Sequence, residues 1–175
     1  MEFEKLNALI LHSIEHERGG AQVYESAIQC ALNEDLREGW TAHLDQTRRH
    51  ISTLERVCEV LQLDPDEPSP GRDVVRTFGA ALVAAMHEAS SAGDPVVAQR
   101  VASECVTLAE AKDFVDWEKV GRASEASEGP LERALRSAFA AIESRMAEPY
   151  HTKGDCRQLW MEALGLHAVA PIDAA

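Results

Sequence analysis

Aromatic residues, which β-sheet proteins use heavily, are scarce in this chain. They make up 5% of its 175 residues, and no run of alternating β-branched residues marks an exposed strand. Apolar residues nevertheless account for 45% of the chain, and Ala, Leu and Glu are abundant. This composition predicts an all-α protein.

Long apolar runs and paired cysteines are also missing. No stretch approaches the roughly 20 apolar residues that span a bilayer, and the first residues, MEFEKLNALILHSIEHE, have neither the basic start nor the cleavage site of a secretory signal. The four cysteines form no Cys-x-x-Cys pair, which is typical of free thiols in a reducing compartment. We therefore expect a cytoplasmic protein, and we interpret Cys58 as a small buried apolar residue.

Basic residues are outnumbered, 17 against 30 acidic ones, so the formal net charge is −13. This charge repels phosphate backbones and anionic lipids, and we expect binding to neither nucleic acid nor membranes. The sequence also lacks a glycine-rich phosphate loop, a serine-based catalytic motif and an evident base beside any cysteine. It leaves an enzymatic activity uncertain and favours a protein that is not an enzyme.

A long amphipathic helix is the strongest pattern in the chain. Its apolar stripe recurs at spacings of three and four residues between Trp40 and Leu61, and the helix should end near Leu63. Further helices are expected at about 3–32, 73–90, 95–120, 130–148 and 155–164. Between them lie the proline-rich stretch 64–71, the boundary signal Gly93-Asp94-Pro95 and a small-residue linker at 121–129.

This order of helices is typical of a four-helix bundle. One helix pair, a long crossover with an extra helix of its own, and a second pair are expected to form a bundle domain over residues 1–148. Residues 149–175 should form a C-terminal tail with one short helix, in which Leu159, Trp160 and Leu164 share an apolar face. That face needs cover from the bundle or from a second subunit, and a homodimer is the simplest assembly.

Two acidic residues stand at apolar positions of the predicted helices. Glu17 falls on the inner stripe of the first helix, just before Gly19 and Gly20. Glu104 falls on the stripe of the helix at 95–120, with Val97, Val101, Leu108, Ala111, Val115 and Glu118. An unpaired buried carboxylate costs several kcal/mol, so each needs a partner or a proton. On the second helix, charged residues accompany the stripe at the level of Thr47: Asp45, Arg48, Arg49 and His50.

Ferritin-like di-metal sites use one Glu on each of two helices and a Glu-x-x-His pair on each of the other two. Of the seven histidines, His151 alone has Glu three residues before it, at Glu148, and Pro149 breaks the helix that this pair would need. The sequence therefore lacks the standard di-iron site.

The segment HLDQTRRHISTLERV, His43 to Val57, resembles the second helix of the YciF-like branch of the ferritin-like superfamily, where an HLEET or HLEQT motif introduces that helix. The resemblance extends over about residues 4–146 and implies a ferritin-like, stress-associated and dimeric protein. It matches acidic ligands of that branch to Glu17, Asp45 and Glu104. Their second partners are replaced by Arg48 and Thr107.

The leading hypothesis is therefore a metal site depleted of ligands, with no cofactor expected. In it, Arg48 lies among Glu17, Asp45 and Glu104 and replaces the charge of an ion. In the other interpretation, Asp45 and Arg48 form an ordinary surface pair. These three carboxylates, with His50, are also candidate ligands for one iron, manganese or zinc ion in a metal-binding or redox protein.

Two further possibilities remain open. A helical interaction module would use the C-terminal tail as its working surface. A zinc site could draw on His12 and His16, which are spaced i,i+4, with Glu15, or on His43 and His50.

Overall fold

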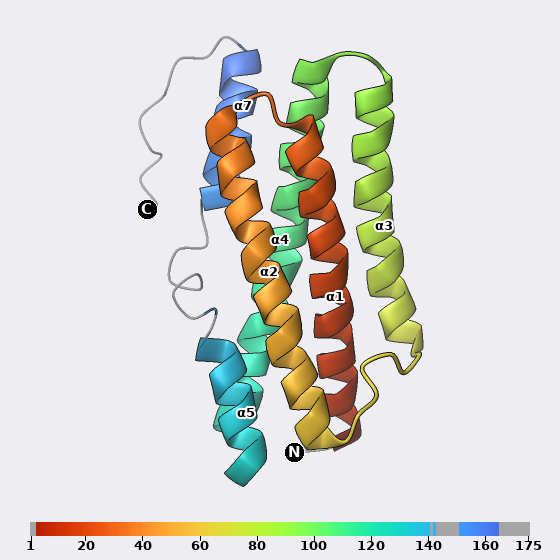
Figure 1. Ribbon diagram of the computed structural model, residues 1–175, viewed down its shortest axis with the longest axis vertical. Coiled ribbons are helices and arrows are strands. Elements are labelled where there is room, and N and C mark those ends of the chain that lie inside the picture. The colour runs from red at the N-terminus through yellow and green to blue at the C-terminus, as the bar shows by residue number, and fades with distance from the viewer. Residues whose placement is uncertain (1–2, 141, 143–150, 165–175) are drawn as a thin grey trace.

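Helices form almost all of the part of the chain that the structure describes, residues 3–140, 142 and 151–164, in a computed structural model (Figure 1). No strand occurs in these residues, so the all-α prediction is confirmed. Of the expected tail, residues 151–164 are described. The helices are α1 (Phe3–Cys30), α2 (Glu34–Leu61), α3 (Pro70–Ser91), α4 (Pro95–Glu125), α5 (Gly129–Ala140) and α7 (His151–Ala163).

Local capping signals explain most of these helix ends. Asn33 caps the start of α2 by accepting from the backbone N–H of Leu36, so it opens this helix and does not end α1. The side chain of Ser69 caps α3 in the same way. Asp94 accepts from two backbone N–H groups of α4, Pro95 follows it, and Gly93 has a φ of 83°, as the boundary signal predicts.

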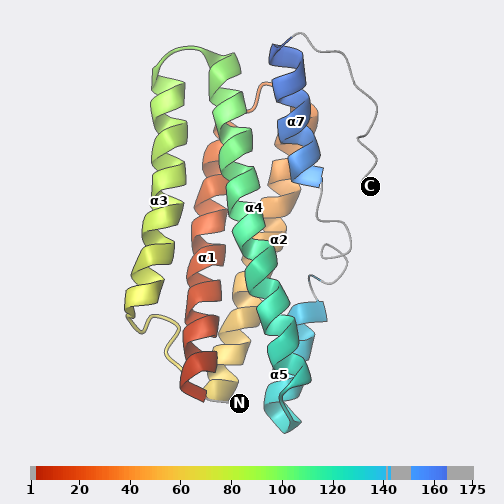
Figure 2. The same cartoon turned by 180° about the vertical axis from the view of Figure 1, so that it is seen from behind.

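The helices run up and down along one long axis (Figures 1 and 2). Helix α1 contacts α2, α3 and α4, and α5 packs against α2 and α4 at one end of the bundle. The connection from α2 to α4 passes through α3, which packs on the outside of α1 and α4. Helix α7 packs on α4 at the other end, where Leu159 contacts the core and Trp160 and Leu164 remain exposed. No described helix is long and apolar enough to cross a membrane.

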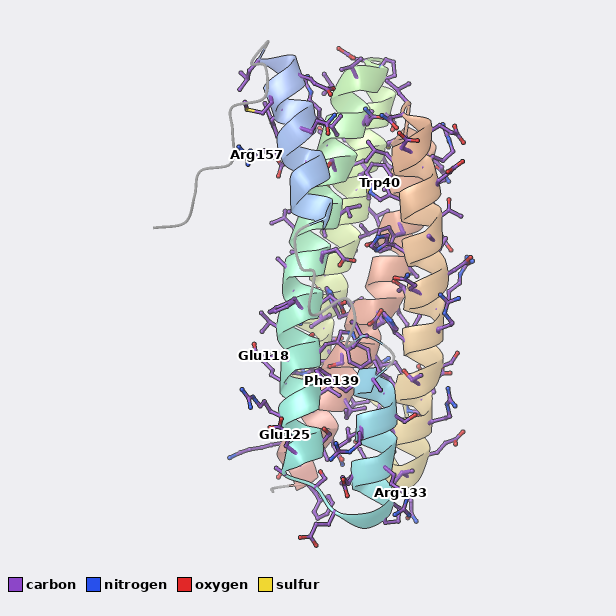
Figure 3. The ribbon with its side chains drawn as sticks, turned by 90° about the vertical axis from the view of Figure 1, so that its left-hand side faces the viewer. Trp40, Glu118, Glu125, Arg133, Phe139 and Arg157 are labelled. Atoms are coloured by element: carbon purple, nitrogen blue, oxygen red, sulfur yellow. The ribbon has the colours of Figure 1, made fainter. Side chains whose placement is uncertain are left out.

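The inner face of α4 differs from the predicted stripe. Leu108 and Val115 are 51% and 43% exposed, and Glu118 lies on the outer side of the helix (Figure 3). The buried face instead carries mostly small and polar residues, among them Ala98, Ala102, Cys105, Ala109, Asp113, Asp116, Trp117 and Val120. The prediction was wrong because α4 has apolar residues on both faces, and small side chains allow closer helix packing than large ones.

Helix α4 also continues through the first residues of the expected linker. Gly121 is buried inside the helix, where a Cβ atom would lie 2.7 Å from the ring of Phe139 on α5 (Figure 3). Gly121 therefore allows α4 and α5 to pack closely and does not mark the end of α4. On α5 the apolar residues Leu135 and Ala138 are buried, as is Ile142 beyond it.

The core consists of two apolar clusters with polar residues between them. One cluster contains Val23, Trp40 and Val106, and the other contains Ile14, Leu54 and Val120. On each of three helices the buried residues between the two clusters are polar. They are Glu15, His16 and Glu17 on α1, Thr47 and His50 on α2, and Asp113 and Asp116 on α4. We call these seven residues the polar layer.

Helix α3 is attached to α1 by a close approach and by buried charge. A Cβ atom on Gly79 would lie 3.3 Å from the Cα atom of Gly19, so the two backbones nearly touch there. Toward the start of α3, the buried Arg72 donates to Glu15 of α1 over 2.6 Å. Arg76 donates to the other oxygen of the same carboxylate over 2.7 Å.

The α1–α3 contact can be tested by substitution of its glycines. Gly79→Val should lower the free energy of unfolding by about 1–3 kcal/mol, because the branched side chain forces the two helices apart. Gly39→Val is the matched control, since a Cβ atom on Gly39 has no neighbour within 4 Å. Urea unfolding followed by circular dichroism measures both, and equal values would mean that the close approach does not limit packing.

Candidate functional site

The charged residues expected around Thr47 divide between the inside and the outside of α2. Thr47 and His50 are buried, whereas Asp45 and Arg48 are exposed. The side chain of Arg48 is 56% exposed and pairs with Glu25 over 2.9 Å and with Asp45 over 3.7 Å. The expectation that Arg48 lies among buried carboxylates is therefore wrong. Positions 45 and 48 are spaced i,i+3 and therefore lie on the same face of α2, and that face is exposed to solvent.

Glu104 lies apart from Glu17 and takes part in the contact between α4 and α7. Its carboxylate accepts from the indole Nε1–H of Trp160 over 2.5 Å, and Arg100 lies 5.5 Å from the centre of the same ring. Both contacts hold the C-terminal helix on the bundle. Glu104 thus belongs to this interface, and the expected grouping of Glu17, Asp45 and Glu104 is wrong.

Glu17 is 3% exposed and lies among donors from two other helices. Its Oε1 atom accepts from the indole Nε1–H of Trp117 on α4 over 2.7 Å, and the same oxygen is 3.1 Å from Nδ1 of His50 on α2. A carboxylate oxygen only accepts, so Nδ1 of His50 carries the proton in this contact. The rings of His50 and Trp117 meet edge to face, with their centres 5.3 Å apart. We call these three residues the Glu17 cluster.

A second group of similar composition, with a tyrosine in place of the tryptophan, lies nearer the other end of the bundle. The hydroxyl of Tyr24 on α1 donates to the carboxylate of Glu110 on α4. The ring of His43 on α2 stacks on Tyr24, with centres 5.6 Å apart. The carboxylate and the aromatic donor have exchanged helices relative to the Glu17 cluster. Helices α1 and α4 run in opposite directions (Figure 2), so the group that holds the carboxylate on α1 and the group that holds it on α4 lie at different heights along the bundle.

The same spacing on three helices produces this arrangement. Glu17 and Tyr24, His43 and His50, and Glu110 and Trp117 are each seven residues apart, which is two helical turns or about 10 Å along the axis. The sequence analysis identified Glu17 and His50 but missed Trp117, Tyr24 and Glu110. The repeated seven-residue spacing was the signal that could have found them.

The residues around Glu17 match a di-metal ligand set only in part. Glu17 and Glu110 supply one carboxylate from each of two helices, but Thr47 stands three residues before His50, where such a site has Glu. In the Glu17 cluster Trp117 faces the carboxylate, and an indole nitrogen donates but does not bind a metal. Across the described residues, no three carboxylate, histidine or cysteine side chains converge in a geometry that could hold a metal ion. Glu148 lies outside the described residues.

The alternative zinc site around His12 and His16 is not formed either. His16 Nε2 lies 3.0 Å from the backbone oxygen of Ala109. Glu15 is engaged by Arg72 and Arg76. Burial opposes ionisation of Glu15, but the hydrogen bonds from Arg76 and Arg72 outweigh it and hold the pKa of this carboxyl below its usual range. A carboxylate paired with two guanidinium groups is a poor ligand, so Glu15 acts in the attachment of α3.

The cysteines are buried, free thiols, in agreement with the interpretation of Cys58. Burial raises the pKa of Cys58 to about 11, and burial likewise raises the pKa of Cys105 to about 11. Thiols with such pKa values are not ionised near pH 7 and are weak nucleophiles.

The hydrogen bond from Trp117 to Glu17 should contribute to stability. Trp117→Phe keeps the ring buried but removes the Nε1–H donor, and it should lower the free energy of unfolding by about 1–3 kcal/mol because a buried oxygen loses a partner. Trp160→Phe is the matched control, since the half-exposed Trp160 makes the same type of bond to Glu104. If chemical unfolding shows the same loss of unfolding free energy for both variants, burial of the Trp117 hydrogen bond adds nothing to its contribution to stability.

The placement of Arg48 gives a second stability test. Arg48→Met should change the free energy of unfolding by no more than about 0.5 kcal/mol, because its ion pairs are exposed. Arg72→Met should lower the free energy of unfolding by about 3 kcal/mol, because it leaves the buried Glu15 short of a partner. A large loss for Arg48→Met would contradict the surface placement.

Buried His16 should make the protein sensitive to acid. Burial, and next the charge of Lys112, lower the pKa of His16, against the opposing effects of Asp116, the Ala109 carbonyl and Glu110. The unfolded chain therefore takes up a proton first, and stability should fall as the pH drops below 6.5 toward the lowered pKa. Thermal unfolding across this range should show a weaker dependence for His16→Gln and an unchanged one for exposed His87→Gln.

Comparison with known proteins connects this geometry to a family. The family described as Domain of unknown function (DUF892) matches residues 11–111, which is more than half of the chain and includes Glu17, His50 and Glu110 but not Trp117. No curated protein and no solved structure shows a significant match to the chain. The protein therefore belongs to the DUF892 family, a ferritin-like family.

Proposed function

We propose that this protein is a non-enzymatic, ferritin-like bundle of the YciF-like type, and that its metal site is depleted of ligands. The observation that carries the proposal is the Glu17 cluster. There, Trp117 and His50 contact the buried carboxylate of Glu17 at hydrogen-bond distance. These donors stabilise the carboxylate in the place of a metal ion.

The arrangement of neighbouring residues supports the same function. Thr47 is buried at the position where a carboxylate of α2 would complete the ligand set. Its methyl group faces Gly20 of α1, where an added Cβ atom would lie 3.8 Å from it. Arg48, which the sequence analysis assigned to this role, has no part in the cluster.

The alternative function is a metal-binding or redox protein that holds iron, manganese or zinc. Glu17 and His50 favour it, because they are ligand types that face each other from two neighbouring helices. In that case the hydrogen bonds of the Glu17 cluster would have to open before an ion could bind. Asp45 and Glu104 have no place in this alternative.

Metal analysis separates the two functions. Protein purified without chelator, and then equilibrated with Fe²⁺, Mn²⁺ or Zn²⁺ and desalted, should contain far less than one ion per chain. Glu17→Gln should not change this content, and Glu25→Gln serves as the control for adventitious binding at the exposed surface. A stoichiometric ion that is lost in Glu17→Gln and kept in Glu25→Gln would reject the depleted site and support the alternative.

The remaining parts of the proposal concern the setting of the protein. We assign the protein to the cytoplasm and propose that it forms a homodimer. Its role is stress-associated, and it acts through assembly or through binding to a partner. Trp160 of α7 and Leu164, directly after its end, support an interface near this helix, because both are exposed apolar residues.

A further inference from the structure

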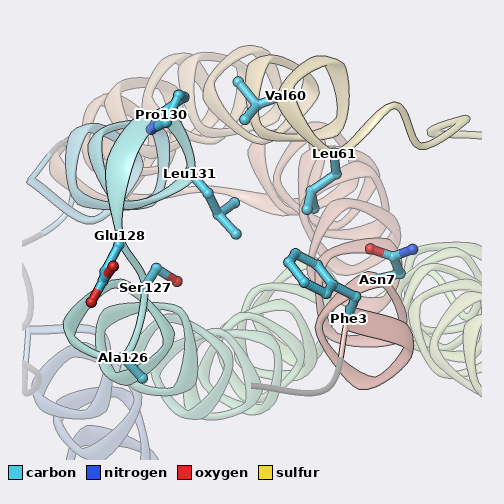
Figure 4. Close-up of a pocket in the computed structure, with 9 residues that line it drawn as sticks. All are labelled: Phe3, Asn7, Val60, Leu61, Ala126, Ser127, Glu128, Pro130 and Leu131. Atoms are coloured by element: carbon cyan, nitrogen blue, oxygen red, sulfur yellow. The ribbon is translucent and has the colours of Figure 1, made fainter.

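A pocket of about 600 Å³ opens at the end of the bundle where α1 and α5 begin and α2 and α4 end. This volume lies within the range of small-molecule sites. Figure 4 shows side chains from all three walls directed toward its centre, from the first turns of α1, the last turn of α2 and the α4–α5 turn. Its lining residues are Phe3, Asn7, Val60, Leu61, Ala126, Ser127, Glu128, Pro130 and Leu131.

The walls of the pocket are apolar and partly uncovered. Leu61, Leu131 and the ring of Phe3 border its centre (Figure 4). Phe3 is 65% exposed and Val60 is also exposed, so two of the large exposed apolar side chains of the described chain gather at this one place. Apolar surface that remains uncovered around a concavity favours a ligand with an apolar body.

Two side-chain oxygens of the pocket are placed to accept hydrogen bonds. Oδ1 of Asn7 is buried, turns toward the pocket in Figure 4, and has no hydrogen-bond partner. The hydroxyl of Ser127 donates to the backbone oxygen of Ala123 over 2.7 Å, so its lone pairs remain for an incoming donor. A ligand that satisfies both oxygens must therefore supply donors.

The charge around the pocket favours a cation. None of the nine lining residues is basic, Glu128 projects from the rim, and the chain carries a formal net charge of −13. Two helices begin and two end beside the pocket, so the contributions of their dipoles oppose one another and the side chains decide the sign.

We propose that this pocket binds a small amphipathic amine. The apolar body of the ligand packs against Phe3, Leu61 and Leu131, and its ammonium group donates to Asn7 Oδ1 and Ser127 Oγ, with Glu128 nearby. Asn7 Oδ1 is buried beside the ring of Phe3, which is 65% exposed, so the ligand displaces this ring to reach the amide oxygen. The site is separate from the Glu17 cluster and does not depend on the proposed function.

Two dansyl probes with one fluorophore and opposite charge test the proposal on the full chain. Dansylcadaverine carries an amine, and dansyl-6-aminohexanoic acid carries a carboxylate on a linker of similar length. We expect the amine to bind with a blue-shifted emission and the acid to bind at least about tenfold more weakly. Equal binding of the two probes, or binding of neither, would overturn the proposal.

Variants then locate the site. Asn7→Leu and Ser127→Ala should each weaken binding of the amine by about three- to tenfold, as expected for the loss of one hydrogen bond. Leu131→Trp should abolish it by filling the pocket. Ser137→Ala, an exposed change on α5 away from the pocket, should leave binding unchanged. If circular dichroism shows all variants folded and binding is the same in each, the amine binds elsewhere and the proposal fails.

Discussion

Glu17 fixes the way in which the three long inner helices fit together. A buried carboxyl group costs several kcal/mol unless its oxygens are matched, and its contacts come from α2 and α4. Both contacts need donors at the same height along the bundle. A slide of α4 by one turn would move Trp117 about 5 Å away and leave Glu17 Oε1 without the indole donor. Apolar packing alone tolerates such slides better, so the polar layer specifies the register of the helices.

Burial of the two apolar clusters contributes the free energy that offsets the cost of burying the polar layer. They lie on either side of it and are built from the same helices, so the layer is held between them. Outside this inner group, α3 is attached through the buried pair of Arg72 and Glu15, and α7 through Trp160 and Glu104. Charged groups thus appear in two roles, since the layer sets the register and the outer pairs attach the peripheral helices.

Sequence analysis predicted the helices well because their ends depend on local residues. Asp94 and Pro95 act within one turn, and the start of α4 lies where they predict it. Which face of α4 is buried depends on the neighbouring helices. The larger apolar residues Leu108 and Val115 lie on its exposed face. No local pattern distinguishes the two faces of a helix that is apolar on both. For the same reason Trp117 was missed, although Glu17 itself was identified as buried.

The error over Arg48 and the correct placement of Glu17 have one physical origin. A buried carboxyl group needs a hydrogen-bond donor, but any donor that reaches it is sufficient. The sequence alone does not show which donors lie near it in the fold. The long Arg48 side chain keeps its charge in water on the outer face of α2, whereas His50 and Trp117 bury rings that fill space and still donate. Ring donors fit a tightly packed helix interface with little loss of side-chain entropy. An indole also keeps its proton at any ordinary pH, so the Trp117 bond holds Glu17 in one place and makes the Glu17 cluster a fixed part of the core.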